Sequence, residues 1–259
     1  KLLIFSDSRQ DAAFFAPYLE RTYNQVLQRR LILKTLLEDS LGREGELWLE
    51  DVAVPLLKQA TAAGCFSEDE KSTFERRQTV LTWLMQELVT LNRRLSLEGL
   101  GFLEFRLRQP TMWQPPSFLQ QAPWSLDREE CWSLLALLLD TLRQQGAVTF
   151  PDMVSPQEDV FAPRNKVMYV REDQADSKAG ILSWVPTRGV NRRLDFLERL
   201  LAQRASDSSP AGRRAIAAAA LRDLWKHLTE PRSAWAKFLV PTSRPRRGVV
   251  YQLSHKQWQ

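Results

Sequence analysis

Hydrophobic residues recur at helical spacing over long stretches of this chain, and this pattern limits the possible folds most strongly. The clearest stretch is 127–144, where Asp127 precedes the apolar positions and Gly146 follows them. An aspartate before a helix and a glycine after it are typical helix boundaries. Further helices are predicted at 9–22, 26–42, 47–62, 74–91 and 215–228. The acidic run 67–70 is a helix-start signal ahead of 74–91, and the alternating pattern that ends at residue 105 predicts a short strand within 94–105. We therefore expect a mostly helical protein.

Short β-prone runs follow two of these helices. The runs 147–150 and 167–170 come after the helix at 127–144. The runs 238–240 and 249–253 come after the helix at 215–228. A helix that stops and is followed by two strands is the ending of a winged helix. The same order is frequent in α+β proteins of other kinds, so both interpretations stay open. The predicted fold class is α+β, mostly α, with one or two winged-helix-like units.

The basic charge of the chain is concentrated near its C-terminal end. The whole sequence has a formal net charge of +5, whereas residues 181–259 carry 15 basic and 5 acidic side chains. Twelve of those 15 are arginines, whose planar guanidinium groups match phosphate geometry. This predicts a polyanionic partner; an arginine-rich surface that pairs with acidic residues elsewhere is the alternative. The candidate phosphate contacts are Arg192, Arg193, Arg213, Arg214, Arg244, Arg246 and Arg247.

Most catalytic and metal-binding classes are excluded by motif. The sequence has no Gly-rich phosphate loop ending in Lys-Ser/Thr, no Gly-x-Ser-x-Gly and no His-Glu-x-x-His. Its two cysteines, Cys65 and Cys131, lie far apart and are expected to be reduced and buried. No apolar run approaches the roughly 18 residues of a membrane helix. We expect a soluble, cytoplasmic chain that is not an enzyme by itself and holds no metal.

The first thirteen residues, KLLIFSDSRQDAA, form an apolar run, a polar turn and the start of a helical pattern. This strand-turn-helix resembles motif IV, which opens the second RecA-like domain of large bacterial superfamily 2 helicases of the DEAD/DEAH-box class. The segments 94–103 and 248–253, the latter followed by Trp258, resemble further patches of the same family. Because Lys1 already stands in the apolar run, we expect this chain to be part of a longer helicase.

The resemblance implies that the motif IV turn contacts the nucleic-acid backbone. The residues in that position are Ser6, Ser8, Arg9 and Gln10, and Ser8 is also a suitable helix cap. The ATP-binding loop, the Asp-Glu motif and the arginine-finger motif of such helicases are absent, so ATP and Mg²⁺ would be bound by the longer parent chain. The implied partners are nucleic acid, with DNA favoured, and the remaining RecA-like motor domains.

The expected organisation has four parts: the start of the RecA-like domain (1–22), a helical insertion (23–110), a first winged-helix-like unit (111–175) and a basic region with a second such hairpin (176–259). The expected function is to bind DNA and help the motor engage or separate a duplex, with Phe161 as a candidate for stacking on a base. The alternative is a helical scaffold that braces the motor or binds a protein, which the nine tryptophans favour. A separate winged-helix regulator fits the first thirteen residues less well.

Overall fold

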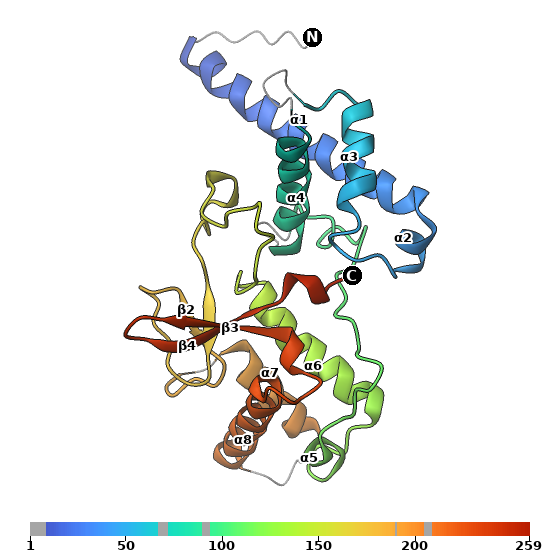
Figure 1. The fold of residues 1–259 in the computed structure, drawn as a ribbon. Helices are drawn as coiled ribbons and strands as arrows, with labels where there is room; N and C mark the ends of the chain where they lie inside the picture. Colours follow the sequence, from blue (N-terminus) through green and yellow to red (C-terminus); the bar gives the residue numbers. More distant parts are fainter. Residues whose placement is uncertain (1–8, 67–71, 90–93, 190, 205–208) are drawn as a thin grey trace.

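The computed structural model describes residues 9–66, 72–89, 94–189, 191–204 and 209–259, with side chains from Tyr18 onward. Helices predominate, and a small sheet lies against them (Figure 1). The described α-helices are α1 (Arg9–Glu38), α2 (Ser40–Glu44), α3 (Ala53–Ala62), α4 (Thr73–Val89), α5 (Ser117–Gln120), α6 (Arg128–Arg143), α7 (Arg192–Arg204) and α8 (Pro210–Thr229). Short 3₁₀ helices are η1 (Asp159–Phe161), η2 (Ala236–Phe238) and η3 (His255–Gln257). The prediction of an α+β fold is confirmed.

The boundary of helix α6 follows its sequence signals closely. Asp127 accepts a hydrogen bond from the backbone N–H of Glu130 at 2.8 Å, and the Glu130 carboxylate accepts one from the N–H of Asp127 at 3.0 Å. This reciprocal pair is a capping box, which satisfies two backbone donors at the helix start. Gly146 has a φ of 78°, a left-handed conformation that suits glycine after a helix.

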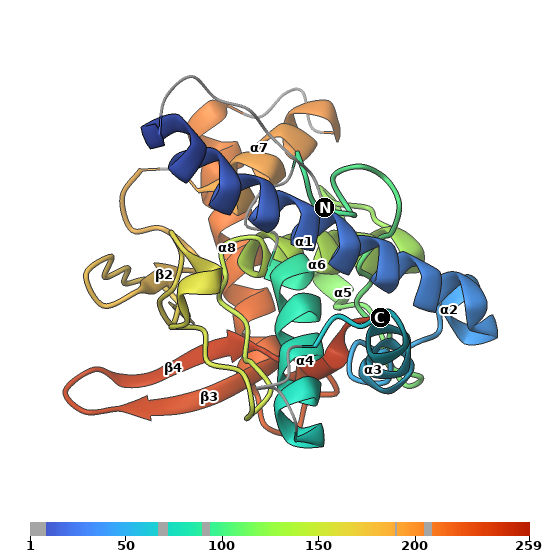
Figure 2. The ribbon, with the colours of Figure 1, turned by 90° about the horizontal axis from the view of Figure 1, so that it is seen from above.

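Helix α1 is continuous from Arg9 to Glu38, so the expected boundary between residues 22 and 23 falls inside a helix. The expected strand at 1–5 lies outside the described residues. In Figure 2, α4 and α3 both lie on the same side of α1. Residues 9–38 therefore form one structural element, and the division of the chain at residue 22 remains a prediction.

Two local predictions need correction. Helix α3 begins at Ala53 rather than at residue 47, because the preceding residues form turns and the N–H of Leu49 bonds to the carbonyl of Trp258 at 3.3 Å. Pro55 stands in the first turn of α3, where its missing N–H costs no helical hydrogen bond. The short strand expected within 94–105 is absent, because the backbone there folds into turns, with Phe102 N–H bonding to the Leu97 carbonyl at 2.9 Å.

The strands of both predicted winged-helix-like units join in a single sheet. Its order is β2 (Ile181–Ser183), β1 (Tyr169–Arg171), β4 (Gly248–Leu253) and β3 (Leu239–Arg244). Strands β1 and β2 are parallel, and the other neighbours are antiparallel. The run 147–150 does not pair with 167–170 as a first wing would; Val148 instead bridges to Leu253. The second hairpin, β3–β4, is present, but β3 continues to Arg244, so the strand is longer than the predicted run 238–240 and the loop is shorter.

Leucines of α6 and a group of tryptophans form much of the core. Leu135, Leu138 and Leu142 are buried, and Trp113 lies 5.4 Å from Trp132, measured between ring centroids. Seven of the nine tryptophans are buried and the other two are half-buried. The tryptophans therefore hold the fold together and do not provide an exposed interface, which removes the main sequence argument for a scaffold.

The C-terminal residues contact segments that are far apart in the sequence. Residues 106 and 259 exchange two backbone hydrogen bonds, at 3.0 and 2.9 Å. The buried ring of His255 lies 2.8 Å from a Glu50 oxygen and 2.7 Å from the Thr149 hydroxyl. Burial lowers the pKa of His255, and the Glu50 carboxylate opposes that shift only in part. A neutral His255 that donates to Glu50 and accepts from Thr149 fits these contacts, so its role is structural.

The two cysteines should differ in their reaction with thiol reagents. Cys131 is buried in α6, and burial raises the pKa of its thiol to about 11, with Asp127 and Glu130 adding to the shift. Only about one thiol in a thousand would then be ionised at pH 8. Cys65 is only half-buried, so the expectation that both thiols are buried is wrong for this residue; partial burial raises its pKa as well. We expect a disulfide reagent such as DTNB to modify Cys65 first and Cys131 only upon unfolding. Equal rates in native buffer would contradict this.

Candidate nucleic-acid interface

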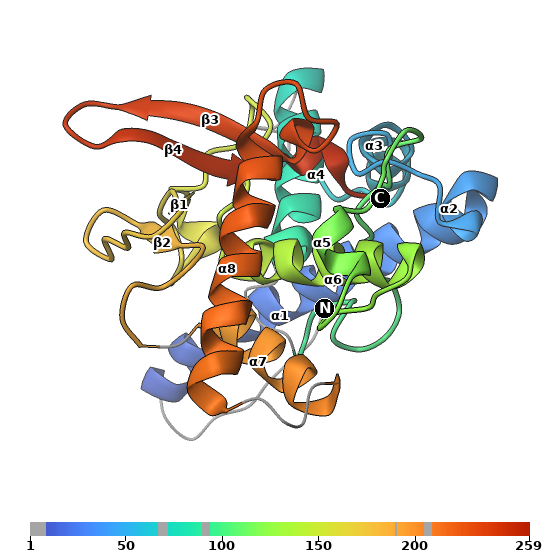
Figure 3. The same cartoon turned by 90° about the horizontal axis from the view of Figure 1, so that it is seen from below.

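The β3–β4 hairpin extends from the body of the molecule and is visible at one side in each ribbon view (Figures 1 and 3). Its base is anchored by Leu239, Val250 and Leu253, which are buried. Its register ends at the pair Arg244–Gly248, so residues 245–247 make the turn. Gly248 has a φ of 69°, and a left-handed residue after a turn is common in three-residue hairpin loops. This geometry presents the turn to solvent.

Three arginines surround this turn, and each has a different setting. Arg244 is exposed, donates to the Tyr169 hydroxyl at 2.6 Å, and its guanidinium carbon lies 4.5 Å from the centroid of the Tyr169 ring. Tyr169 is itself buried beside Val250. A planar cation held over an aromatic ring keeps its remaining N–H donors directed outward at a small entropic cost. Arg244 is therefore a positioned cation.

The other two cations of the turn are more available. Arg247 lies 3.6 Å from a carboxylate oxygen of Asp176, and both side chains are nearly half-exposed. An exposed ion pair of this kind contributes little and exchanges readily with other anions. Arg246 is exposed and has no polar partner among the described residues. The hairpin turn thus offers two to three guanidinium groups to an external phosphate.

The two predicted phosphate contacts at the start of α7, Arg192 and Arg193, lie in different environments. Arg192 is exposed, near the amide of Gln144. Arg193 is only 1% exposed, donates to Thr141, Ser183 and Trp184, and lies 5.0 Å from the centre of the Trp184 ring. Burial lowers the pKa of Arg193 to about 10, so it stays charged at neutral pH. The prediction that Arg193 contacts nucleic acid is wrong, because its donors are used inside the core.

Arg213 and Arg214 lie in the first turns of α8, away from the hairpin. Arg214 forms an ion pair with Glu198 of α7 at 3.3 Å and also donates to the Gly189 carbonyl. The opposite end of α8 packs against the sheet, where Trp225 contacts Tyr251 at 5.2 Å between ring centroids. Arg213 is half-buried and also has an interaction partner. Arg214 thus connects α7 and α8, and neither arginine joins the hairpin cations in one cluster.

Most of the motif IV residues lie outside the part of the chain that the structure describes. Ser6 and Ser8 lie outside the described residues, while Arg9 and Gln10 begin α1, without a description of their side chains. Their contact with nucleic acid remains a prediction from the resemblance. Phe161 can be judged directly: it is 1% exposed and packs on Phe150 at 5.2 Å between ring centroids. The hypothesis that Phe161 stacks on a base is therefore wrong.

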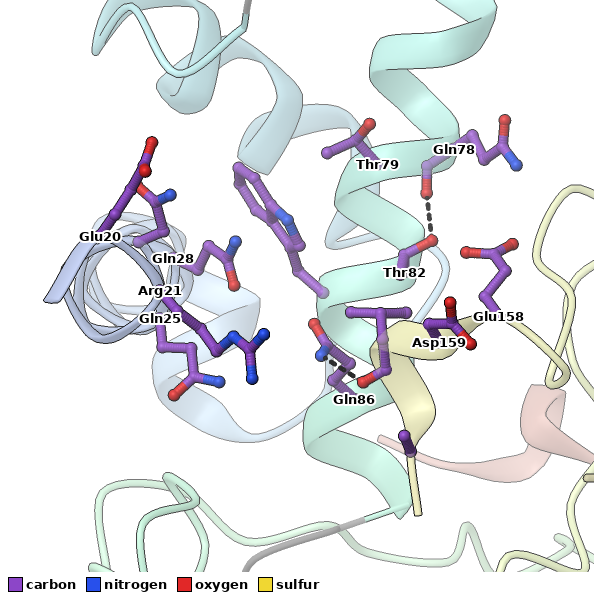
Figure 4. Close-up of a pocket in the computed structure, with 14 residues that line it drawn as sticks. Glu20, Arg21, Gln25, Gln28, Gln78, Thr79, Thr82, Gln86, Glu158 and Asp159 are labelled. Atoms are coloured by element: carbon purple, nitrogen blue, oxygen red, sulfur yellow. Dashed lines mark hydrogen bonds between the residues drawn. The ribbon is translucent and has the colours of Figure 1, made fainter. Parts of the chain in front are cut away.

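A polar cleft of about 820 Å³ lies between α1, α4 and η1. In Figure 4, Gln25 and Gln28 of α1 face Thr82 and Gln86 of α4 across this cleft. The charged residues of its lining are Glu20, Arg21, Glu158 and Asp159. Three carboxylates against one guanidinium repel phosphate groups. This cleft is therefore a poor place for a nucleic-acid backbone, and the hairpin is the better candidate.

Sequence reasoning missed Tyr169, which supports Arg244 from below. Its position in the β-prone run 167–170 was a signal for a strand, but a tyrosine that holds an arginine cannot be distinguished there from a core tyrosine.

No group of three or more His, Cys, Asp or Glu side chains among the described residues could hold a metal ion. Within the same residues, no helix has both the length and the apolar character needed to span a bilayer.

These observations describe a basic β-hairpin on a helical body, and comparison with known proteins adds no relative to them. No family model, curated protein or solved structure matches the chain.

Proposed function

We propose that this chain is a nucleic-acid-binding accessory segment of an ATP-dependent superfamily 2 helicase. The observation that carries the proposal is the projecting β3–β4 hairpin with Arg244, Arg246 and Arg247 around its turn. Its partner is DNA, which it contacts through the phosphate backbone. The sequence resemblance of residues 1–13 to motif IV supports the link to a helicase. ATP and Mg²⁺ would be bound by the motor domains of the parent chain.

The chemistry of this contact is electrostatic and independent of base sequence. Arginine forms paired hydrogen bonds with phosphate oxygens, and such contacts position a protein on DNA without reading its sequence. A hairpin that projects from a rigid body can lie along one strand at a fork while the body remains beside the duplex. The accessory role is therefore to hold the motor on a junction and to help separate its strands.

The direct test is a salt titration of binding to a labelled forked DNA duplex. Each phosphate neutralised should contribute about −0.9 to the slope of log affinity against log salt concentration. With two to three arginines engaged, we expect a slope of about −2 to −3 between 50 and 200 mM salt. Fluorescence anisotropy measures the affinity. No binding at 50 mM salt, or an affinity that does not change with salt, would contradict the proposal.

A second candidate function is protein binding, as in the alternative of a helical scaffold. It is favoured by an observation unrelated to the tryptophans: several large apolar side chains are exposed together along α1 and the segment 95–102. Because protein docking and DNA binding would use different faces of the chain, the two functions are compatible.

A further inference from the structure

A groove with exposed apolar walls runs beside α1, and its volume is about 670 Å³. We call it the α1 groove and define its apolar lining as Val26, Leu33, Leu37, Leu95, Leu100 and Phe102. Single exposed hydrophobic residues are ordinary on protein surfaces, but a continuous concave group of them marks an interaction site. Val26, Leu37 and Phe102 are 59%, 66% and 63% exposed. These three side chains are therefore open to solvent, whereas Leu33 between them is half-buried.

One wall of the groove is the regular surface of a helix. Val26, Leu33 and Leu37 are separated by seven and four positions, so they lie along one side of α1. Val26 and Leu37 are eleven residues apart, which is about 16 Å along a helix axis. A partner helix of about three turns would match that length.

The opposite wall is the segment 95–102, which is held in place by hydrogen bonds. The N–H of Leu97 donates to the Glu87 carboxylate at 2.8 Å, and the N–H of Leu100 bonds to the Ser96 carbonyl at 3.0 Å. Glu87 is also paired with Arg29 at 2.7 Å. These contacts connect both walls to α4, so the groove is formed before any partner arrives and loses little entropy on binding.

The charges along the groove select the partner. Arg29, Arg30, Lys34 and Glu38 line it. Arg29 is committed to Glu87, whereas Arg30 is exposed with no polar partner among the described residues. Within the described part of the chain, the one ion-pair partner of Lys34 is Glu38, at 3.7 Å, and both side chains are exposed. The edge of the groove on α1 is therefore positive, and acidic side chains would be favoured beside it.

We propose that the α1 groove binds an amphipathic helix of a partner protein that carries acidic residues beside its apolar stripe. An apolar helix face inserted into a hydrophobic groove is a common mode of peptide recognition. Apolar residues at positions i, i+4 and i+7 of the partner would contact the two walls, and its Glu or Asp side chains would lie near Arg30 and Lys34. This site is separate from the hairpin and does not depend on DNA binding.

The experiment is a selection from a display library of 18-residue helical peptides with apolar residues at i, i+4 and i+7 and randomised flanking positions. The target is this chain, with counter-selection against a groove variant that combines Val26→Gln, Leu100→Gln and Phe102→Gln. All three residues are exposed, so the variant should fold, which its melting temperature checks. Selected peptides should be enriched in Glu and Asp, and should lose about tenfold or more in affinity for the groove variant.

Two matched variants complete the test. Met112→Gln with Phe74→Gln replaces exposed apolar residues outside the groove and should leave peptide binding unchanged. Arg30→Glu with Lys34→Glu should weaken acidic peptides and favour the same peptides with lysines in place of the acids. Failure to select groove-dependent peptides, or selection of basic ones, would overturn the proposal. So would a dimer in sedimentation analysis that the groove variant dissociates, because the occupant would then be a second copy.

Discussion

Replacement of Arg143 by methionine should lower the free energy of unfolding by about 3–5 kcal/mol, the range for breaking a buried ion pair. Arg143 is 1% exposed. Its guanidinium donates to both carboxylate oxygens of Glu98 at 2.8 Å, to Asp140 at 2.5 Å and to the Leu88 carbonyl at 2.7 Å. Urea denaturation followed by far-UV circular dichroism would measure the change.

The size of this effect follows from what Arg143 connects. It joins α6 to the end of α4 and to the segment around Glu98, and its guanidinium carbon lies 5.2 Å from the centre of the Trp258 ring near the C-terminus. Methionine fills similar volume but leaves the Leu88 carbonyl without its donor and the Glu98 carboxylate without its cation. Leaving buried polar groups without partners costs more than the lost bonds were worth.

Two further variants decide whether the charge network is responsible. Arg106 forms an ion pair with Glu104 at 2.8 Å, and both side chains are more than 60% exposed; Arg106→Met should therefore cost less than about 1 kcal/mol. Glu98→Gln combined with Arg143→Met should be less destabilising than the sum of the two single changes, because it removes the uncompensated charge. A loss below 1 kcal/mol for Arg143→Met would refute the network.

The helices were the most predictable part of the fold, since their signals are local. In α6, the Asp127 cap, the apolar spacing and Gly146 all lie within twenty residues of each other. The start of α4 shows the limit of such signals. Ser72 caps this helix by accepting from the Glu75 N–H at 3.1 Å, whereas the sequence favoured the acidic run 67–70, which lies outside the described residues. Two adjacent sets of suitable capping residues cannot be ranked by pattern alone.

The sheet was less predictable because its pairings connect distant residues. Strand β2 was not predicted, although Ala179 and Gly180 followed by the apolar Ile181 indicate a turn and then the start of a strand. Gly180 has a φ of 69°, and a Cβ there would lie 2.6 Å from the Val167 carbonyl oxygen. Only glycine therefore permits the close approach that places β2 beside β1. Pairing of β1 with β4, at Val170 and Tyr251, joins residues that no local pattern relates.

The candidate site was predictable in its charge and only partly in its residues. The cluster Arg244, Arg246 and Arg247 follows from composition and from the hairpin pattern, and all three are exposed. Composition cannot show that Arg193 points into the core, because that depends on Ser183 and Trp184 coming together with α6. Tertiary contacts decide whether an arginine is buried, so a count of charges along the sequence does not separate buried from exposed arginines.

Reversal of the hairpin charges, with Arg244, Arg246 and Arg247 changed to Glu, should weaken binding to the forked duplex by about 100-fold at low salt, because phosphate attraction is replaced by repulsion. Anisotropy titration measures the loss, and the salt slope should approach zero. Only Arg244 gives up contacts with a buried residue, Tyr169, so the melting temperature is measured beside the affinity to separate lost folding from lost binding. The matched control reverses three exposed cations on α2, α3 and α4: Arg43, Lys58 and Arg77. It alters net charge equally but leaves the hairpin intact, so its effect should be below about tenfold. Equal losses in both variants would show that binding follows net charge alone, and the hairpin would then have no special role.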